Sequence, residues 1–131
     1  MITIIVIVTS ISLFVIGGFL PAFLIYHDSI LGWTAFGYGC LSIPFHPDAF
    51  GWYANIFYLA SLVLLNKASK LAFFASLFGL FLASSVFSMK TVFDNGQMAP
   101  ILSIGSGFYF WLFAQLIIAG YAFVNTYQEN L

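Results

Sequence analysis

Four apolar stretches that contain no lysine, arginine, aspartate or glutamate fill most of this chain. They are Thr3 to Tyr26, Gly51 to Leu65, Leu71 to Met89 and Ile104 to Val124. Over all 131 residues, 63% are hydrophobic and only 5% are charged, whereas soluble domains carry about 25% charged residues. A small soluble domain buries only about two-thirds of its chain surface, so it could not hide this many apolar side chains. We therefore expect the chain to be an integral membrane protein whose apolar surface faces lipid.

The lengths of these stretches predict membrane-spanning helices. A helix needs about 20 residues to cross a hydrocarbon core of roughly 30 Å, and flanking residues extend the short second stretch toward that length. The predicted helices occupy residues 3–26, 48–66, 69–89 and 104–125. The expected fold class is an all-α membrane protein, a four-transmembrane-helix bundle forming one domain over residues 1–131. Gly17, Gly18 and Pro21 are expected to allow a bend or a close neighbour near the end of the first helix.

The distribution of charge predicts the orientation of the chain. Lys67 and Lys70 lie in the short joint between the second and third helices, and they are two of only three basic residues. Short loops rich in lysine stay on the cytoplasmic side of a membrane. The joint is therefore expected inside, which places both termini in the cytoplasm of a multi-pass protein of the bacterial inner (plasma) membrane.

The segment between the first two helices differs from the rest of the chain. Residues 29–43 are apolar and rich in glycine, and they include Trp33 and Tyr38. They are too few to cross the membrane comfortably, so we expect an interfacial or re-entrant element that lies over the outer end of the bundle. Trp33 and Tyr38 are accordingly candidate contacts with a partner.

Small residues recur on the third predicted helix. Ala75, Gly79 and Ala83 are each four residues apart and therefore share one face of the helix. Small faces allow helices to approach closely in a membrane. The pattern is expected to mark an internal helix contact in the bundle, with a homodimer seam as the alternative.

Two amide side chains fall at membrane depth, Asn55 and Gln115. An amide in hydrocarbon costs free energy unless it is paired, and hydrogen bonds between helices contribute about 0.6–2 kcal/mol. We expect both side chains to link helices to one another. The alternative is a polar lining for a pore or a ligand pocket.

Two pairs of polar residues flank the segment between the first two helices. His27 and Asp28 precede it, and His46 and Asp48 follow it. Such side chains could bind a divalent metal or form an acid–base pair, but neither spacing matches a metal motif. The simpler interpretation is that these are ordinary polar loop residues, with Asp48 capping the second helix. We therefore expect no metal, no cofactor and no catalytic residue.

Charge also excludes several classes of function. The formal net charge is −1 and no basic stripe is present, so binding of nucleic acid is not expected. The helix interiors contain no carboxylate, and such a group is what a coupled proton or cation transporter usually needs. Small multidrug transporters, for example, depend on a glutamate in the first helix, where this chain offers only serine and threonine.

Several short motifs spread over most of the chain are similar to those of a known group. They are Trp-Tyr-Ala-Asn at residues 52–55, the basic turn at 66–72, Leu-Pro-Ala-Phe at 20–23, Gly-Trp at 32–33 and Gly-Phe-Tyr-Phe-Trp-Leu at 107–112. The chain thereby resembles a group of small bacterial four-helix inner-membrane proteins with no assigned activity. In that group a W-x-A-N motif starts the second helix and the third helix is rich in alanine and leucine. Ile56 departs from the pattern, because the group usually has proline there.

Three functional hypotheses follow. The first is a non-catalytic membrane protein, an accessory subunit or a toxin-immunity protein, that acts on a protein partner or assembles with copies of itself. The second is an oligomeric channel or transporter for a small solute, whose flux would depend on Asn55 or Gln115. The third is a membrane enzyme that uses the outer histidines and aspartates. The first is preferred because the helix interiors contain neither charged residues nor a catalytic motif.

Overall fold

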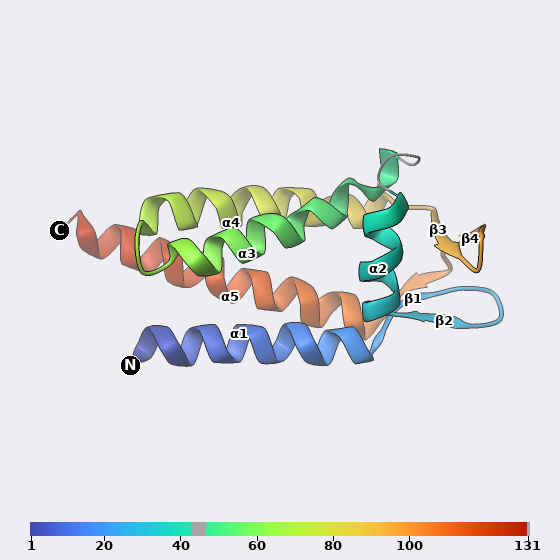
Figure 1. Cartoon of the computed structure of the whole chain (residues 1–131), viewed down its shortest axis with the longest axis horizontal. Helices are drawn as coiled ribbons and strands as arrows, with labels where there is room; N and C mark the ends of the chain where they lie inside the picture. The colour runs from blue at the N-terminus through green and yellow to red at the C-terminus, as the bar shows by residue number, and fades with distance from the viewer. Residues whose placement is uncertain (43–46, 131) are drawn as a thin grey trace.

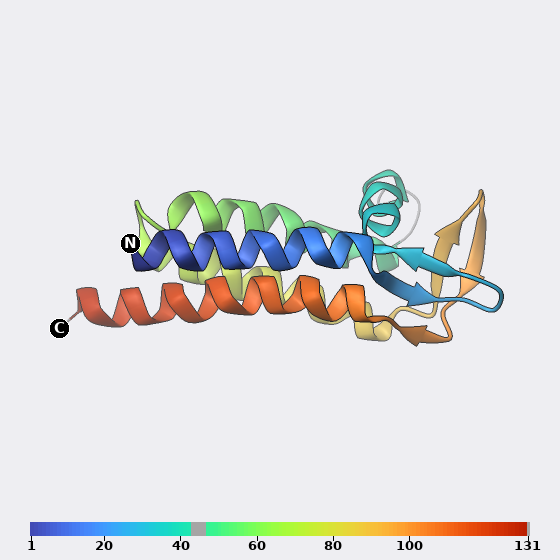
Figure 2. The ribbon, with the colours of Figure 1, turned by 90° about the horizontal axis from the view of Figure 1, so that it is seen from below.

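The computed structural model describes residues 1–42 and 47–130, and this part of the chain is mostly helical. Four helices lie side by side along the long axis of the molecule (Figure 1, Figure 2). They are α1 (Ile2–Phe19), α3 (Ala54–Leu64), α4 (Ser69–Ser84) and α5 (Ser106–Glu129). Both termini lie at one end of these helices, beside the joint between α3 and α4 (Figure 1).

Three of the helical segments are long and apolar enough to cross a membrane: Ile2–Phe19, Ser69–Ser88 and Ser106–Glu129. The second of them combines α4 with the short 3-10 helix η2 (Ser85–Ser88). The fourth apolar helix, Phe50–Leu64, is shorter. The chain enters it as the 3-10 helix η1 (Pro47–Tyr53) and continues as α3.

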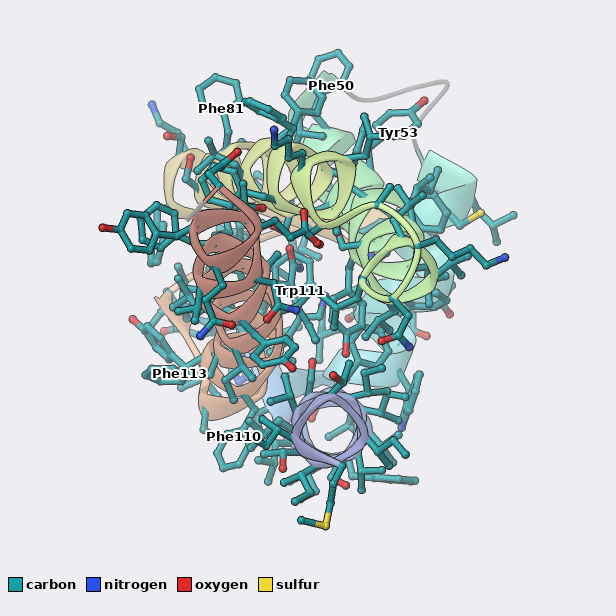
Figure 3. All side chains as sticks on the ribbon, turned by 90° about the vertical axis from the view of Figure 1, so that its left-hand side faces the viewer. Phe50, Tyr53, Phe81, Phe110, Trp111 and Phe113 are labelled. Carbon is teal, nitrogen blue, oxygen red and sulfur yellow. The ribbon has the colours of Figure 1, made fainter. Side chains whose placement is uncertain are left out.

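The helices expose many large apolar side chains, and most of the residues that they bury are small or polar. Exposed apolar residues occur on every helix, including Ile5, Val8, Leu59, Val63, Leu77, Phe81, Phe113 and Phe123. The buried positions include Ser10, Ser61, Ala72, Ser76, Ala83, Ala114 and Ala122. Viewed along the bundle, Phe81 and Phe113 point outward, whereas Trp111 points toward the centre (Figure 3). This distribution suits an apolar solvent, where small faces give close helix packing.

The expectation of an all-α fold is only partly correct, because small sheets lie at the end of the bundle opposite the termini (Figure 1). Helix α1 ends at Phe19 instead of Tyr26, and the chain continues as strand β1 (Pro21–Leu24). Proline has no amide hydrogen and disfavours helix in the residue before it. Beyond that break the backbone still needs hydrogen-bond partners, which β2 (Ser29–Leu31) and β5 (Ser103–Ile104) supply on either side of β1.

The segment predicted as an interfacial or re-entrant element is part strand and part helix. After β2, the chain turns into helix α2 (Gly32–Ser42). Helix α2 runs across the end of the bundle, roughly perpendicular to the long helices (Figure 1). Of the predicted range 29–43, the last residue lies outside the described part of the chain.

A second hairpin extends from the same end of the molecule. Strands β3 (Thr91–Asp94) and β4 (Gln97–Pro100) pair in an antiparallel register. The turn between them has positive φ angles, 45° at Asn95 and 84° at Gly96, as a tight type I′ hairpin turn requires. We call α2 together with β1 to β5, residues 21–42 and 91–104, the cap.

The small residues of α4 face its neighbours within the molecule. Gly79 and Ala83 are buried together with Ala72 and Ser76, while Ala75 is half-buried. A methyl group on Gly79 would lie 3.1 Å from the Cβ atom of Phe57 in α3. Of the row that recurs at every fourth residue, Gly79 therefore lies against α3 inside this molecule, Ala83 is buried and Ala75 is half-buried.

Candidate functional site

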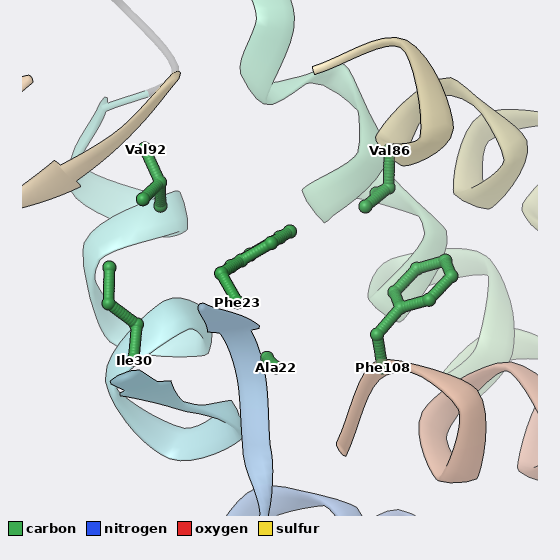
Figure 4. Packing of buried hydrophobic residues seen from close by; sticks show 6 residues of the cluster. All are labelled: Ala22, Phe23, Ile30, Val86, Val92 and Phe108. Carbon is green, nitrogen blue, oxygen red and sulfur yellow. The ribbon is translucent and has the colours of Figure 1, made fainter. Parts of the chain in front are cut away.

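A cavity of about 130 Å³ lies where the long helices meet the cap. Its walls come from α1, α2, α3, α5, the two 3-10 helices and strands β1, β3 and β4, and they are almost entirely apolar. The buried cluster beside it contains Ala22, Phe23, Ile30, Val86, Val92 and Phe108. Phe23 projects from β1 into the space between Val92 on one side and Val86 on the other (Figure 4).

The side-chain amide of Asn55 forms hydrogen bonds that connect the elements on the inner wall of this cavity. The Asn55 side chain accepts a hydrogen bond from the indole Nε1 of Trp111 at 2.7 Å. It also donates from Nδ2 to the carbonyl oxygen of Trp52 at 2.9 Å. The indole of Trp52 in turn donates to the carbonyl oxygen of Phe36 at 2.8 Å. This chain of hydrogen bonds connects α5, α3, η1 and α2, and so holds the cap on the bundle.

Glycine positions allow the indole rings to lie against backbone. A methyl group on Gly18 would overlap the ring of Trp33, and one on Gly39 would lie 2.6 Å from Cδ1 of Trp52. Both distances are far shorter than carbon–carbon contact, which is optimal near 3.5–4.0 Å. Gly18 and Gly39 therefore allow close packing between α1, α2 and η1.

Trp33 and Tyr38, the predicted contact residues, both line the cavity from α2. Trp33 is 37% exposed and makes edge-on ring contacts with Phe14 and Phe19 of α1 at 5.9 and 6.1 Å between ring centroids. Tyr38 contacts Phe93 of β3 at 5.5 Å. Trp33 therefore lies between the cavity and the outside, whereas Tyr38 connects α2 to the second hairpin.

His27 and Asp28 lie at the exposed turn between β1 and β2. Asp28 closes this turn, because its carbonyl accepts from the amide of Ile25 at 3.0 Å and its carboxylate accepts from the amide of Ser29 at 2.7 Å. His46 and the side chain of Asp48 lie outside the described residues. Among residues 1–42 and 47–130, no three His, Cys, Asp or Glu side chains come together as a metal site.

Gln115 does not line the cavity, although it is on the same helix as Trp111. Its side chain is 2% exposed, and its Nε2 atom has no hydrogen-bond partner among the described residues. The Oε1 atom would lie 3.5 Å from a methyl group placed on Gly79. The two amides that the sequence singled out therefore differ: Asn55 connects two helices and the cap, whereas Gln115 fills space between α4 and α5.

A polar connection through the middle of the bundle was not predicted from the sequence. The hydroxyl of Ser10 donates to the carbonyl oxygen of Ala114 at 2.7 Å. Because a serine hydroxyl has one hydrogen, the 2.7 Å contact between Ser10 and Tyr58 is a bond donated by tyrosine. Ser10 was visible as a polar residue in an apolar helix. Its partners lie 48 and 104 residues away in the chain, and a single sequence holds no signal that pairs them.

Comparison with known proteins finds no relative: no family model matches the chain, and neither the curated proteins nor the solved structures contain a match.

Proposed function

We propose that this chain is a small non-catalytic protein of the bacterial inner membrane that acts on a protein partner through its cap. An accessory subunit and an immunity protein against a membrane-inserting toxin are concrete forms of this function. The observation that supports it is the apolar outer surface of a well-anchored cap. Its exposed side chains include Tyr26, Leu31, Trp33, Leu41, Met98 and Leu102. Aromatic and aliphatic side chains on a rigid support are typical of protein-binding surfaces.

The state of the two amides favours this function over solute transport. A pore lining would present polar atoms to water, but Asn55 uses both ends of its side chain in hydrogen bonds to tryptophans. Gln115 is buried between helices away from the cavity. The cavity wall is correspondingly apolar, which gives a polar solute little to replace its hydration.

The proposed placement in the membrane has four spanning segments and both termini in the cytoplasm. At a rise of 1.5 Å per residue, the 18 residues of α1 extend about 27 Å, close to the thickness of a hydrocarbon core. The joint between α3 and α4, residues 65–68, bears Lys67 and lies at the same end as both termini, and Lys70 follows in the first turn of α4 (Figure 1). The preference of lysine for the cytoplasmic side then places the cap outside.

Labelling of the single cysteine of the chain, Cys40, can test this orientation in the unaltered protein. Cys40 is exposed on α2. In cells whose outer membrane has been permeabilised, a membrane-impermeant maleimide is therefore expected to label Cys40. A variant with Cys40→Ser and Asn66→Cys moves the thiol to the exposed joint between α3 and α4. That thiol should react only after the inner membrane is permeabilised. The reverse pattern would contradict the proposed orientation.

Contact with a partner can be tested by a photo-crosslinking amino acid at single leucine positions. Leu41 on the cap is 70% exposed, and Leu59 on the lipid-facing side of α3 is 56% exposed. Crosslinking in cells is expected to give one adduct of discrete mass from position 41 and none from position 59. An adduct of twice the chain's mass would identify a second copy as the partner. Identical adducts from both positions, or none from position 41, would contradict a role for the cap.

A further inference from the structure

We propose that the cavity beneath the cap binds the end of one hydrocarbon chain of a membrane lipid or fatty acid. The site lies between Trp33 of α2, Phe23 of β1, Val86 of η2 and the α5 residues Phe108 and Trp111. This ligand site shares Trp33 and Met98 with the surface that we assign to the partner, but its occupancy does not depend on that assignment.

The size of the cavity fits a short length of hydrocarbon. Its volume is about 130 Å³. An enclosed apolar cavity of about 150 Å³ in another protein stays dry and admits benzene. The cavity beneath the cap is thus large enough for about six carbon atoms, the terminal part of an acyl chain and not a whole lipid.

The chemistry of the wall favours an occupant without polar groups. The indoles of Trp52 and Trp111 donate to protein oxygens, and the Asn55 amide is engaged at both its oxygen and its nitrogen. The wall therefore offers few unpaired polar atoms. Water in such a space would lack the two to four partners that an ordered buried water requires, whereas a methylene chain loses no hydrogen bonds by entering it.

The surroundings of the cavity supply such a chain. Phe19 and Ile16, on the same end of α1, are 69% and 46% exposed, and in the proposed placement they face the hydrocarbon of the outer leaflet. Trp33 contacts Phe19 on that side and lines the cavity. A chain end that passes Trp33 therefore moves from lipid into the protein without crossing a polar layer.

The experiment uses the purified protein in phosphatidylcholine vesicles, with a photoactivatable diazirine at the end of an acyl chain. One set of vesicles has the diazirine on the phospholipid, and a second has it on free fatty acid. After illumination, mass spectrometry is expected to find labels on Phe108, Val86 or Met89, which line the cavity. The set that gives these labels identifies the source of the chain. Labels confined to outward-facing positions such as Leu77 and Phe81 in both sets would overturn the proposal.

Two valine-to-phenylalanine substitutions test whether the labels arise from a chain inside the cavity. Val86 is 6% exposed and lines the cavity, whereas Val63 is 64% exposed on α3. Val86→Phe is expected to abolish labelling of Phe108 while outward-facing positions remain labelled, and Val63→Phe is expected to leave all labels unchanged. Persistence of the Phe108 label in folded Val86→Phe would also overturn the proposal. If that variant fails to fold, the positions labelled in the unaltered protein still decide the question.

Discussion

Replacing Gly107 with alanine is expected to lower the free energy of unfolding by about 1–3 kcal/mol, the usual cost of forcing extra atoms into a packed site. The added methyl group would lie 2.5 Å from the carbonyl oxygen of Leu20 and 2.7 Å from that of Gly17. Both obstructing atoms belong to the backbone and cannot rotate away. Helices α1 and α5 would have to separate at the end that supports the cap.

The same helix provides the control. Gly120 is also within α5, and a methyl group there would meet nothing within 4 Å. Gly120→Ala is therefore expected to leave stability unchanged or to raise it by up to about 1 kcal/mol through helix propensity. Unfolding by sodium dodecyl sulfate in mixed micelles, followed by far-ultraviolet circular dichroism, measures both variants. Equal stabilities of the two variants would contradict backbone contact between α1 and α5.

The second large effect is expected for Asn55→Leu. This substitution removes the acceptor for the Trp111 indole and the donor to the Trp52 carbonyl, in a site where Asn55 is 5% exposed. A buried polar group left without a partner costs about 1–3 kcal/mol. The free energy of unfolding in the same micelles should fall by about that amount, and the cap should become more accessible to protease because its attachment to the bundle is weakened.

Gln115→Leu makes the same chemical change one turn further along α5 from Trp111. Its Nε2 atom already has no hydrogen-bond partner in the described part of the chain, so leucine is expected to leave stability unchanged or to increase it. Both substitutions remove a polar amide, but only Asn55→Leu removes hydrogen bonds. Comparison of the two variants therefore separates the effect of the lost hydrogen bonds on stability from the effect of the lost polar group. A similar loss of stability in both variants would show that the Asn55 hydrogen bonds contribute nothing specific.

Much of the helical part of the fold could be predicted from the sequence. The predicted segment 69–89 agrees closely with α4 and η2, and the segment 104–125 corresponds to α5 (Ser106–Glu129). The first helix was predicted to be too long, because the apolar composition of the chain continues past Phe19, where α1 ends. Pro21 was interpreted as a bend, whereas the structure uses it to begin a strand. The composition of an apolar run indicates an apolar environment. It cannot distinguish a helix from a strand whose hydrogen-bond partners lie elsewhere in the chain.

The candidate site was predictable only in its parts. Trp33, Tyr38 and Asn55 were each selected from the sequence, and the structure places all three on the cavity wall. Their arrangement around one cavity was not foreseen. The bond between Asn55 and Trp111 joins residues 56 positions apart, and only the packing of α3 against α5 brings them together.

The sequence by itself determined the apolar character and the approximate positions of the long helices. Those properties follow from local composition, because a long uncharged apolar stretch has the length and composition that a membrane-spanning helix requires. The tertiary structure alone decided where α1 ends, which strands pair, which amide is satisfied and where a cavity remains. Each of these depends on atoms from distant parts of the chain coming within hydrogen-bonding or van der Waals distance, and local composition does not specify such distances.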